Sequence, residues 1–142
     1  MNQIQNPKRY TITLDDDPVF YRIIAQITGI PSLPFKIGEK LVEKAKSYDP
    51  VCVFVDVHLE SKKSGLDILP ALRNSWPFIP IFVVTSYQND DHLGAALALG
   101  ANDFLKKPIN PNELTARMRV RLSEMDDRRA LDTLTVGDVS FT

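Results

Sequence analysis

Acidic, hydroxyl and basic side chains stand directly after four separate apolar segments of this sequence. In chain order they are Asp15, Asp16, Asp17, Asp56, Thr85 and Lys107. Carboxylates gathered at one point repel one another, by about 4 kcal/mol for a pair about 4 Å apart at an intermediate effective dielectric. Mg²⁺ prefers oxygen ligands of this kind, while a lysine adds positive charge and a threonine adds a hydrogen-bond donor. Such a set suits the handling of a phosphoryl group, whose transfer depends on positioning and charge neutralisation.

The segment that ends on Asp56 indicates how such a residue is held. Residues 51–55 are apolar without a break, a run too short to cross a membrane and typical of a strand buried on both faces. An Asp at the carboxyl end of such a strand points to the edge where open α/β sheets place their sites. Taken alone, Asp56 is equally suited to capping the next element, so the other segments decide.

Strands and helices alternate along the whole chain. The predicted strands cover 10–14, 33–37, 51–56, 81–84 and 103–105, and the predicted helices begin near 18, 39, 66, 90 and 111. This order predicts an α/β fold with a parallel five-stranded sheet, helices on both faces and right-handed crossovers. Because the carboxyl ends of parallel strands share one edge, the acids, Thr85 and Lys107 are expected to meet there.

Composition narrows the class of protein. The 142 residues, 44% hydrophobic and 25% charged, are typical of one soluble globular domain. A net charge of −1 provides no bulk attraction to nucleic acid or to an acidic membrane. The single cysteine, Cys52, excludes an internal disulfide and is predicted to be a buried apolar residue. The first nine residues contain no apolar segment of signal-peptide length, so we expect a cytoplasmic protein without a membrane partner.

The separated motifs match one known family in order and approximate spacing. Asp15-Asp16, the lone Asp56, Thr85 and the stretch Gly-Ala-Asn-Asp-Phe-Leu-Lys-Lys-Pro over 100–108 resemble the receiver domain of two-component response regulators. The resemblance covers about residues 9–123. It implies a flavodoxin-like, doubly wound sheet with strand order 2-1-3-4-5.

The resemblance also implies a phosphoacceptor reaction. Asp56 would accept a phosphoryl group from a phosphohistidine of a sensor histidine kinase or phosphotransfer protein. Asp15, Asp16, Asp56 and the backbone carbonyl of His58 would hold Mg²⁺. Lys107 would pair with the phosphoryl oxygens, and the bond from Lys107 to Pro108 would be cis. Such a regulator is not an enzyme with turnover, apart from its own phosphorylation and dephosphorylation.

Further residues have roles implied by the same resemblance. Thr85 would move to bond the aspartyl phosphate, and Phe104, in the switch-aromatic position, would turn inward behind it. His58 and Tyr87 would flank the site and tune hydrolysis, which motivates the hypothesis of a long-lived phosphorylated form. From its place in the chain, Asp17 is read as a helix cap, and Lys106 is expected to face solvent.

The surface that would signal to an output domain departs from the family pattern in two places. The loop 59–65 lacks the usual proline and is one residue longer, and the helix 92–99 lacks the basic residue that forms a dimer salt bridge in many DNA-binding relatives. A homodimer through the helix 92–99, the strand 103–105 and the last helix remains an expectation, with Asp103 and Arg117 pairing across it. The arginines of the last helix alternate with acids, which favours internal ion pairs over nucleic-acid binding.

The chain divides into a leader (1–8), the receiver domain (9–123), a helix extension or linker (124–133) and a last stretch (134–142). We predict that 134–141 form a turn and a strand that open an effector domain, and that any DNA binding would need that domain. The stretch resembles the start of a winged-helix effector, and 132–135 echo the start of diguanylate cyclase domains.

Two other readings remain open. In a small Mg²⁺-dependent phosphohydrolase of the haloacid-dehalogenase type, Asp15 would be the nucleophile and Asp17 its partner. In a receiver-like interaction module, the domain would signal by contact alone without phosphorylation.

Overall fold

Five parallel strands form a single sheet in this computed structural model, which describes residues 9–58, 65–86 and 92–137. The strands are β1 (Thr11–Leu14), β2 (Ser32–Phe35), β3 (Cys52–Asp56), β4 (Ile81–Thr85) and β5 (Asp103–Lys106). Their spatial order is β2-β1-β3-β4-β5, and every neighbouring pair is parallel. The predicted flavodoxin-like strand order is therefore confirmed.

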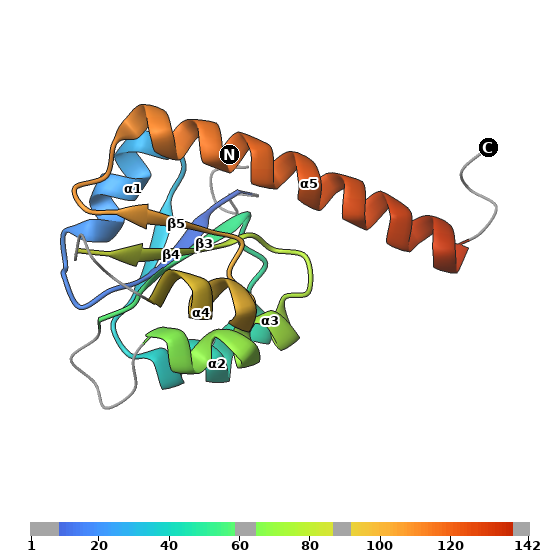
Figure 1. Cartoon of the computed structure of the whole chain (residues 1–142), viewed down its shortest axis with the longest axis horizontal. Coiled ribbons are helices and arrows are strands. Elements are labelled where there is room, and N and C mark those ends of the chain that lie inside the picture. The colour runs from blue at the N-terminus through green and yellow to red at the C-terminus, as the bar shows by residue number, and fades with distance from the viewer. Residues whose placement is uncertain (1–8, 59–64, 87–91, 138–142) are drawn as a thin grey trace, which may run out of the picture.

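Helices cover both faces of the sheet (Figure 1). On one face lie α1 (Phe20–Thr28) and the first half of α5 (Pro111–Gly137), and on the other lie α2 (Gly38–Lys44), α3 (Leu69–Ser75) and α4 (His92–Leu99). Two short 3₁₀ segments, η2 (Ala45–Ser47) and η3 (Gly65–Ile68), adjoin α2 and α3. Pro70 lies in the first turn of α3, where a proline leaves no intrahelical hydrogen bond unmade.

Strand β3 shows why its sequence is apolar at every position. Val53 and Val55 belong to the core under α2 and α3, whereas Cys52 and Phe54 belong to the core under α1 and α5. All four side chains are fully buried, so the strand has no polar face. The Phe54 ring also stacks on Phe82 of β4, with centroids 5.3 Å apart. Asp56 is thereby fixed at the end of the strand that separates the two cores.

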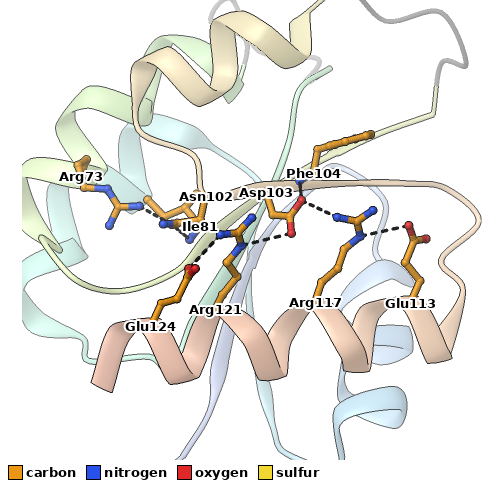
Figure 2. Close-up of polar contacts among 9 residues, drawn as sticks. All are labelled: Arg73, Ile81, Asn102, Asp103, Phe104, Glu113, Arg117, Arg121 and Glu124. Atoms are coloured by element: carbon orange, nitrogen blue, oxygen red, sulfur yellow. Dashed lines mark hydrogen bonds and ion pairs between the residues drawn. The ribbon is translucent and has the colours of Figure 1, made fainter. Parts of the chain in front are cut away.

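Arg73 of α3 ties together the amino ends of β4 and β5. Its guanidinium donates to the carbonyl oxygens of Gly100 (2.7 Å) and Ile79 (2.8 Å) and to Oδ1 of Asn102 (2.6 Å). The same Asn102 oxygen accepts the N–H of Ile81 at 2.7 Å (Figure 2). Because Ile81 begins β4, these bonds fix the register of the strand that carries Thr85 at its other end.

The chain differs from the sequence predictions at two helix ends. Helix α1 begins at Phe20, two residues after Pro18, and Asp17 instead accepts the N–H of Val19 at 2.9 Å in the preceding turn. The predicted turn and strand over 134–141 are wrong for 134–137, because α5 continues to Gly137. Each residue added to an existing helix gains a hydrogen bond without a new nucleation cost, whereas a strand there needs a partner. Residues 138–142 lie outside the described part, as does the leader 1–8.

Across the described residues, no helix combines the length and the apolar character needed to cross a membrane.

Candidate functional site

The carboxyl edge of the sheet brings Asp15, Asp56, Thr85 and Lys107 together. The Nζ atom of Lys107 lies 2.5 Å from Oδ2 of Asp15 and 3.8 Å from Oδ2 of Asp56. Asp15 and Asp56 are each 6% exposed and Thr85 is 4% exposed. Residues separated by up to 92 positions in sequence thus form one polar cluster, as the strand pattern predicts. Lys106, by contrast, is exposed.

Backbone hydrogen bonds set the orientation of these side chains. The N–H of Asp17 donates to Oδ1 of Asp15 at 2.8 Å, and the N–H of His58 donates to Oδ1 of Asp56 at 3.0 Å. The N–H of Lys107 donates to the carbonyl of Thr85 at 2.8 Å, which joins the ends of β4 and β5. The Lys107–Pro108 peptide bond is cis, as expected. Each carboxylate therefore has one oxygen bound to an amide and one oxygen directed towards Lys107.

Gly65 approaches the backbone of the acid more closely than any side chain would permit. A Cβ atom at this position would lie 2.0 Å from the carbonyl oxygen of Asp56 and 2.8 Å from Cγ1 of Val55. The N–H of Gly65 donates to the carbonyl of Val57 at 3.1 Å. The chain thus returns against the end of β3, and this return requires a glycine.

Burial makes Asp56 a weaker acid than usual. Desolvation raises the pKa of its carboxyl from 3.8 to about 6, the His58 amide lowers it, the neighbouring Asp15 raises it and Lys107 lowers it. The loss of hydration on burial raises the pKa of Asp56 by more than the attraction of Lys107 lowers it. Two acids therefore share one ammonium group, and the cluster has capacity for another cation.

The donor set fits Mg²⁺ in chemical type. Asp15 and Asp56 direct oxygens into the cluster, and the raised pKa of Asp56 shows that its anionic form is incompletely stabilised. Among the described residues, no three acidic, histidine or cysteine side chains converge as a ready metal cage. Mg²⁺ commonly takes only one or two protein carboxylates and keeps several waters, so two converging acids suffice. Asp16, half-buried beside Asp15, is near in sequence but does not complete a third converging acid.

Asp103, the first residue of β5, and two arginines of α5 form a second charged group (Figure 2). Arg117 lies 2.9 Å from one Asp103 oxygen and Arg121 lies 3.3 Å from the other. Arg117 and Arg121 also bind Glu113 and Glu124 of their own helix. The expected internal ion pairs are confirmed. Both oxygens of Asp103 have partners within the chain, and its pairing with Arg117 across a dimer stays a prediction.

The aromatic at the switch position borders this charged group. Phe104 is half-buried, and the Arg117 guanidinium lies 5.7 Å from its ring centroid. The ring is thus partly exposed and lies next to an arginine of α5. The inward turn expected for Phe104 stays a prediction. Tyr87 and the altered loop residues 59–64 lie outside the described residues.

One contact at the cluster was not foreseen from the sequence. The ring of Phe20, in the first turn of α1, lies under Lys107, with Nζ 4.6 Å from its centroid. The available signal was the place of Phe20 five residues after Asp15, where a helix that starts at the site edge turns its first apolar side chain inwards.

Comparisons with known proteins agree with this geometry. The sequence model of one protein family, described as the response regulator receiver domain, matches residues 12–119. The acid tolerance regulatory protein ActR of Rhizobium meliloti is 31% identical over 83% of this chain and 62% of its own length. The DNA-binding response regulator MtrA of Mycolicibacterium smegmatis is 28% identical over 92% of this chain and 57% of its own length. The chain thus spans about three fifths of these relatives.

Solved structures show the same fold. A CheY-like receiver domain protein from Methanospirillum hungatei superposes with a TM-score of 0.74 at 22% identity, over 85% of this chain and 98% of its own. NtrX from Brucella abortus gives 0.78 at 22% identity, over 88% of this chain and 29% of its own.

Proposed function

The chain belongs to the response regulator receiver domain family, and from this premise we propose that Asp56 is the acceptor of a phosphoryl group from a histidine kinase or phosphotransfer protein. One observation carries the proposal: Asp15 is already hydrogen-bonded to the Lys107 ammonium at 2.5 Å, whereas Asp56 ends the central strand β3 with its Oδ2 3.8 Å from that ammonium, beyond hydrogen-bond range. Family membership does not support the phosphohydrolase alternative, in which Asp15 would be the nucleophile.

The reaction is a displacement at phosphorus. A carboxylate oxygen of Asp56 forms the new P–O bond while the N–P bond of the donor phosphohistidine breaks and its imidazole leaves. Asp56 must be ionised to attack, and with a pKa of about 6 it is mostly ionised at neutral pH. Lys107 neutralises charge on the phosphoryl oxygens, for which its ammonium is already directed at both acids.

Asp15 and Asp56, whose carboxylates converge, would hold Mg²⁺, and family membership implies Asp16 and the backbone carbonyl of His58 as further ligands. When bound, the ion would supply further neutralisation of phosphoryl charge. Asp15 also orients Lys107 through their 2.5 Å contact. Asp17 is a helix-entry residue in this scheme, since its carboxylate already accepts the Val19 amide.

The phosphorylated state would be read through β4 and β5. Thr85 ends β4 beside the acceptor and is joined to the backbone of Lys107. A shift of Thr85 towards an aspartyl phosphate would change the space available to Phe104 on the neighbouring strand. The half-buried Phe104 would then turn inward, and the surface of α4, β5 and α5 would change its partners. Because MtrA is a DNA-binding response regulator by name, an effector domain that controls transcription is the output we propose.

The acceptor can be identified directly. Wild-type protein incubated with acetyl phosphate and Mg²⁺ should gain one phosphoryl group by intact mass, and borohydride reduction should label Asp56. Asp56→Asn should abolish the label, whereas Asp67→Asn, which changes an exposed acid of η3, should leave it. A label on Asp15 would contradict the proposal, and a protein that is never modified would favour signalling by contact alone.

A further inference from the structure

Phe20 and Lys107 make a contact that neither the strand pattern nor the proposed reaction requires. The ammonium of Lys107 lies 4.6 Å from the centroid of the Phe20 ring. The ring is 2% exposed and belongs to the core between the sheet and α1 and α5. The Lys107 side chain is 20% exposed. The contact is therefore largely removed from water, where attraction between a cation and an aromatic face is stronger than at an exposed site.

The ammonium of Lys107 lies near the two acids as well as the Phe20 ring. Nζ has Asp15 at 2.5 Å and Asp56 at 3.8 Å as its charged partners. The Phe20 ring attracts the ammonium through its π-face and carries no oxygen or nitrogen atom that would compete with the carboxylates for the N–H groups of Lys107. The lysine side chain has a flexible four-carbon stem and many alternative rotamers. An aromatic face next to the ammonium favours the rotamers that keep the ammonium at the carboxyl edge of the sheet.

We propose that Phe20 is a positioning residue: the face of its ring holds the Lys107 ammonium between Asp15 and Asp56, ready for the phosphoryl group. This inference rests on the proposed phosphoacceptor function for its consequence, but the contact itself exists without it. An aliphatic side chain of similar size fills the same core volume and lacks the negative ring face. Phe20→Leu therefore separates the two roles of the ring, packing and attraction.

The contact is tested first without metal and without phosphorylation. In Mg²⁺-free protein, the Hε protons of Lys107 should resonate upfield of those of Lys40, which is exposed, because they lie over a ring. Phe20→Leu should remove this upfield shift. Phe82→Leu is the matched control, since it deletes a buried ring from the same core and should keep the shift. Absence of the shift in the wild-type protein would overturn the proposal without any variant.

The consequence is tested by a double-mutant cycle on the rate of phosphorylation by acetyl phosphate. We expect Phe20→Leu to slow phosphorylation about tenfold, equivalent to about 1.4 kcal/mol. In the Lys107→Met background, Phe20→Leu should have no further effect, because the ring acts through the ammonium. A merely structural role would slow both backgrounds equally, and that result would overturn the proposal.

The two proposals fail in different ways. If Asp56 of the wild-type protein accepts no phosphoryl group, the proposed phosphoacceptor function is refuted. The upfield shift of the Lys107 Hε protons then decides alone whether Phe20 positions the ammonium. If phosphorylation proceeds at Asp56 and Phe20→Leu retains the wild-type rate and the upfield shift, the function stands and the role of Phe20 is refuted.

Discussion

Replacing Asp56, the proposed phosphoacceptor, by asparagine should stabilise the metal-free protein at neutral pH. Burial raises the pKa of Asp56 from 3.8 to about 6, a difference of about 2 units. At 1.36 kcal/mol per unit, ionised Asp56 costs at most about 3 kcal/mol of folding free energy. Solvent at the sheet edge screens part of this cost, and Lys107 loses one partner. We therefore expect Asp56→Asn to raise the free energy of unfolding by about 1–2 kcal/mol.

The sign of the pH dependence follows from the direction of the shift. Folded protein holds the Asp56 proton more tightly than the unfolded chain does, so wild-type stability contributed by this group is greatest below about pH 4 and declines as the pH rises towards about 6. Asp56→Asn lacks this decline. The Oδ1 of an asparagine still accepts the His58 amide, so the local backbone bond is kept.

Urea unfolding at a series of pH values in EDTA measures both effects. The difference in stability between Asp56→Asn and wild type should grow from pH 4 to pH 7 and then level off. Added Mg²⁺ should narrow it by stabilising the wild-type carboxylate. Asp67→Asn, at an exposed acid, provides the control without a comparable pH trend. An Asp56→Asn variant that is less stable than wild type at neutral pH would refute the reasoning.

Two further predictions concern the residues that hold the edge in place. Gly65→Ala places a Cβ 2.0 Å from the Asp56 carbonyl oxygen and should lower the free energy of unfolding in urea by about 1–3 kcal/mol. The control Gly94→Ala in α4, where nothing lies within 4 Å, should be neutral or stabilising by up to about 1 kcal/mol. Equal effects of the two substitutions would contradict the close approach at Gly65. Arg73→Lys loses the guanidinium hydrogen bonds to Gly100, Ile79 and Asn102 and should lower the free energy of unfolding by about 2–4 kcal/mol. Hydrogen exchange at the Ile81 amide should accelerate. An unchanged exchange rate there would contradict the role of Arg73 in fixing β4.

The sheet and its edge were predictable because their signals are local. Each strand is an apolar run, and the side chain that follows it lies at the carboxyl edge whatever the loops do, which placed Asp15, Asp56, Thr85 and Lys107 together. The contacts of Lys107 with Phe20 and of Asp103 with Arg121 were not predictable in the same way. They depend on the angle at which α1 and α5 cross the sheet, and the strand pattern does not encode that angle.

The end of the chain shows a different limit of sequence reasoning. Alternating apolar and polar residues after Leu134 favour a strand in isolation. In the protein they follow an established helix, and continuing its hydrogen bonds carries the helix to Gly137. The prediction was wrong because a neighbouring element, and not the local pattern, set the conformation of 134–137.

Helix α5 has the geometry of a lever. Its first turns are anchored by Leu114 and Met118 in the core, and the 15 residues between Leu122 and Gly137 extend it by about 22 Å at 1.5 Å per residue. In Figure 1 this part projects well beyond the sheet. A tilt of about 5° at the anchored base would therefore move the far end by about 2 Å. A change around Asp103 and its two arginines, too small to alter the core, would reach whatever follows the helix as a displacement of atomic size.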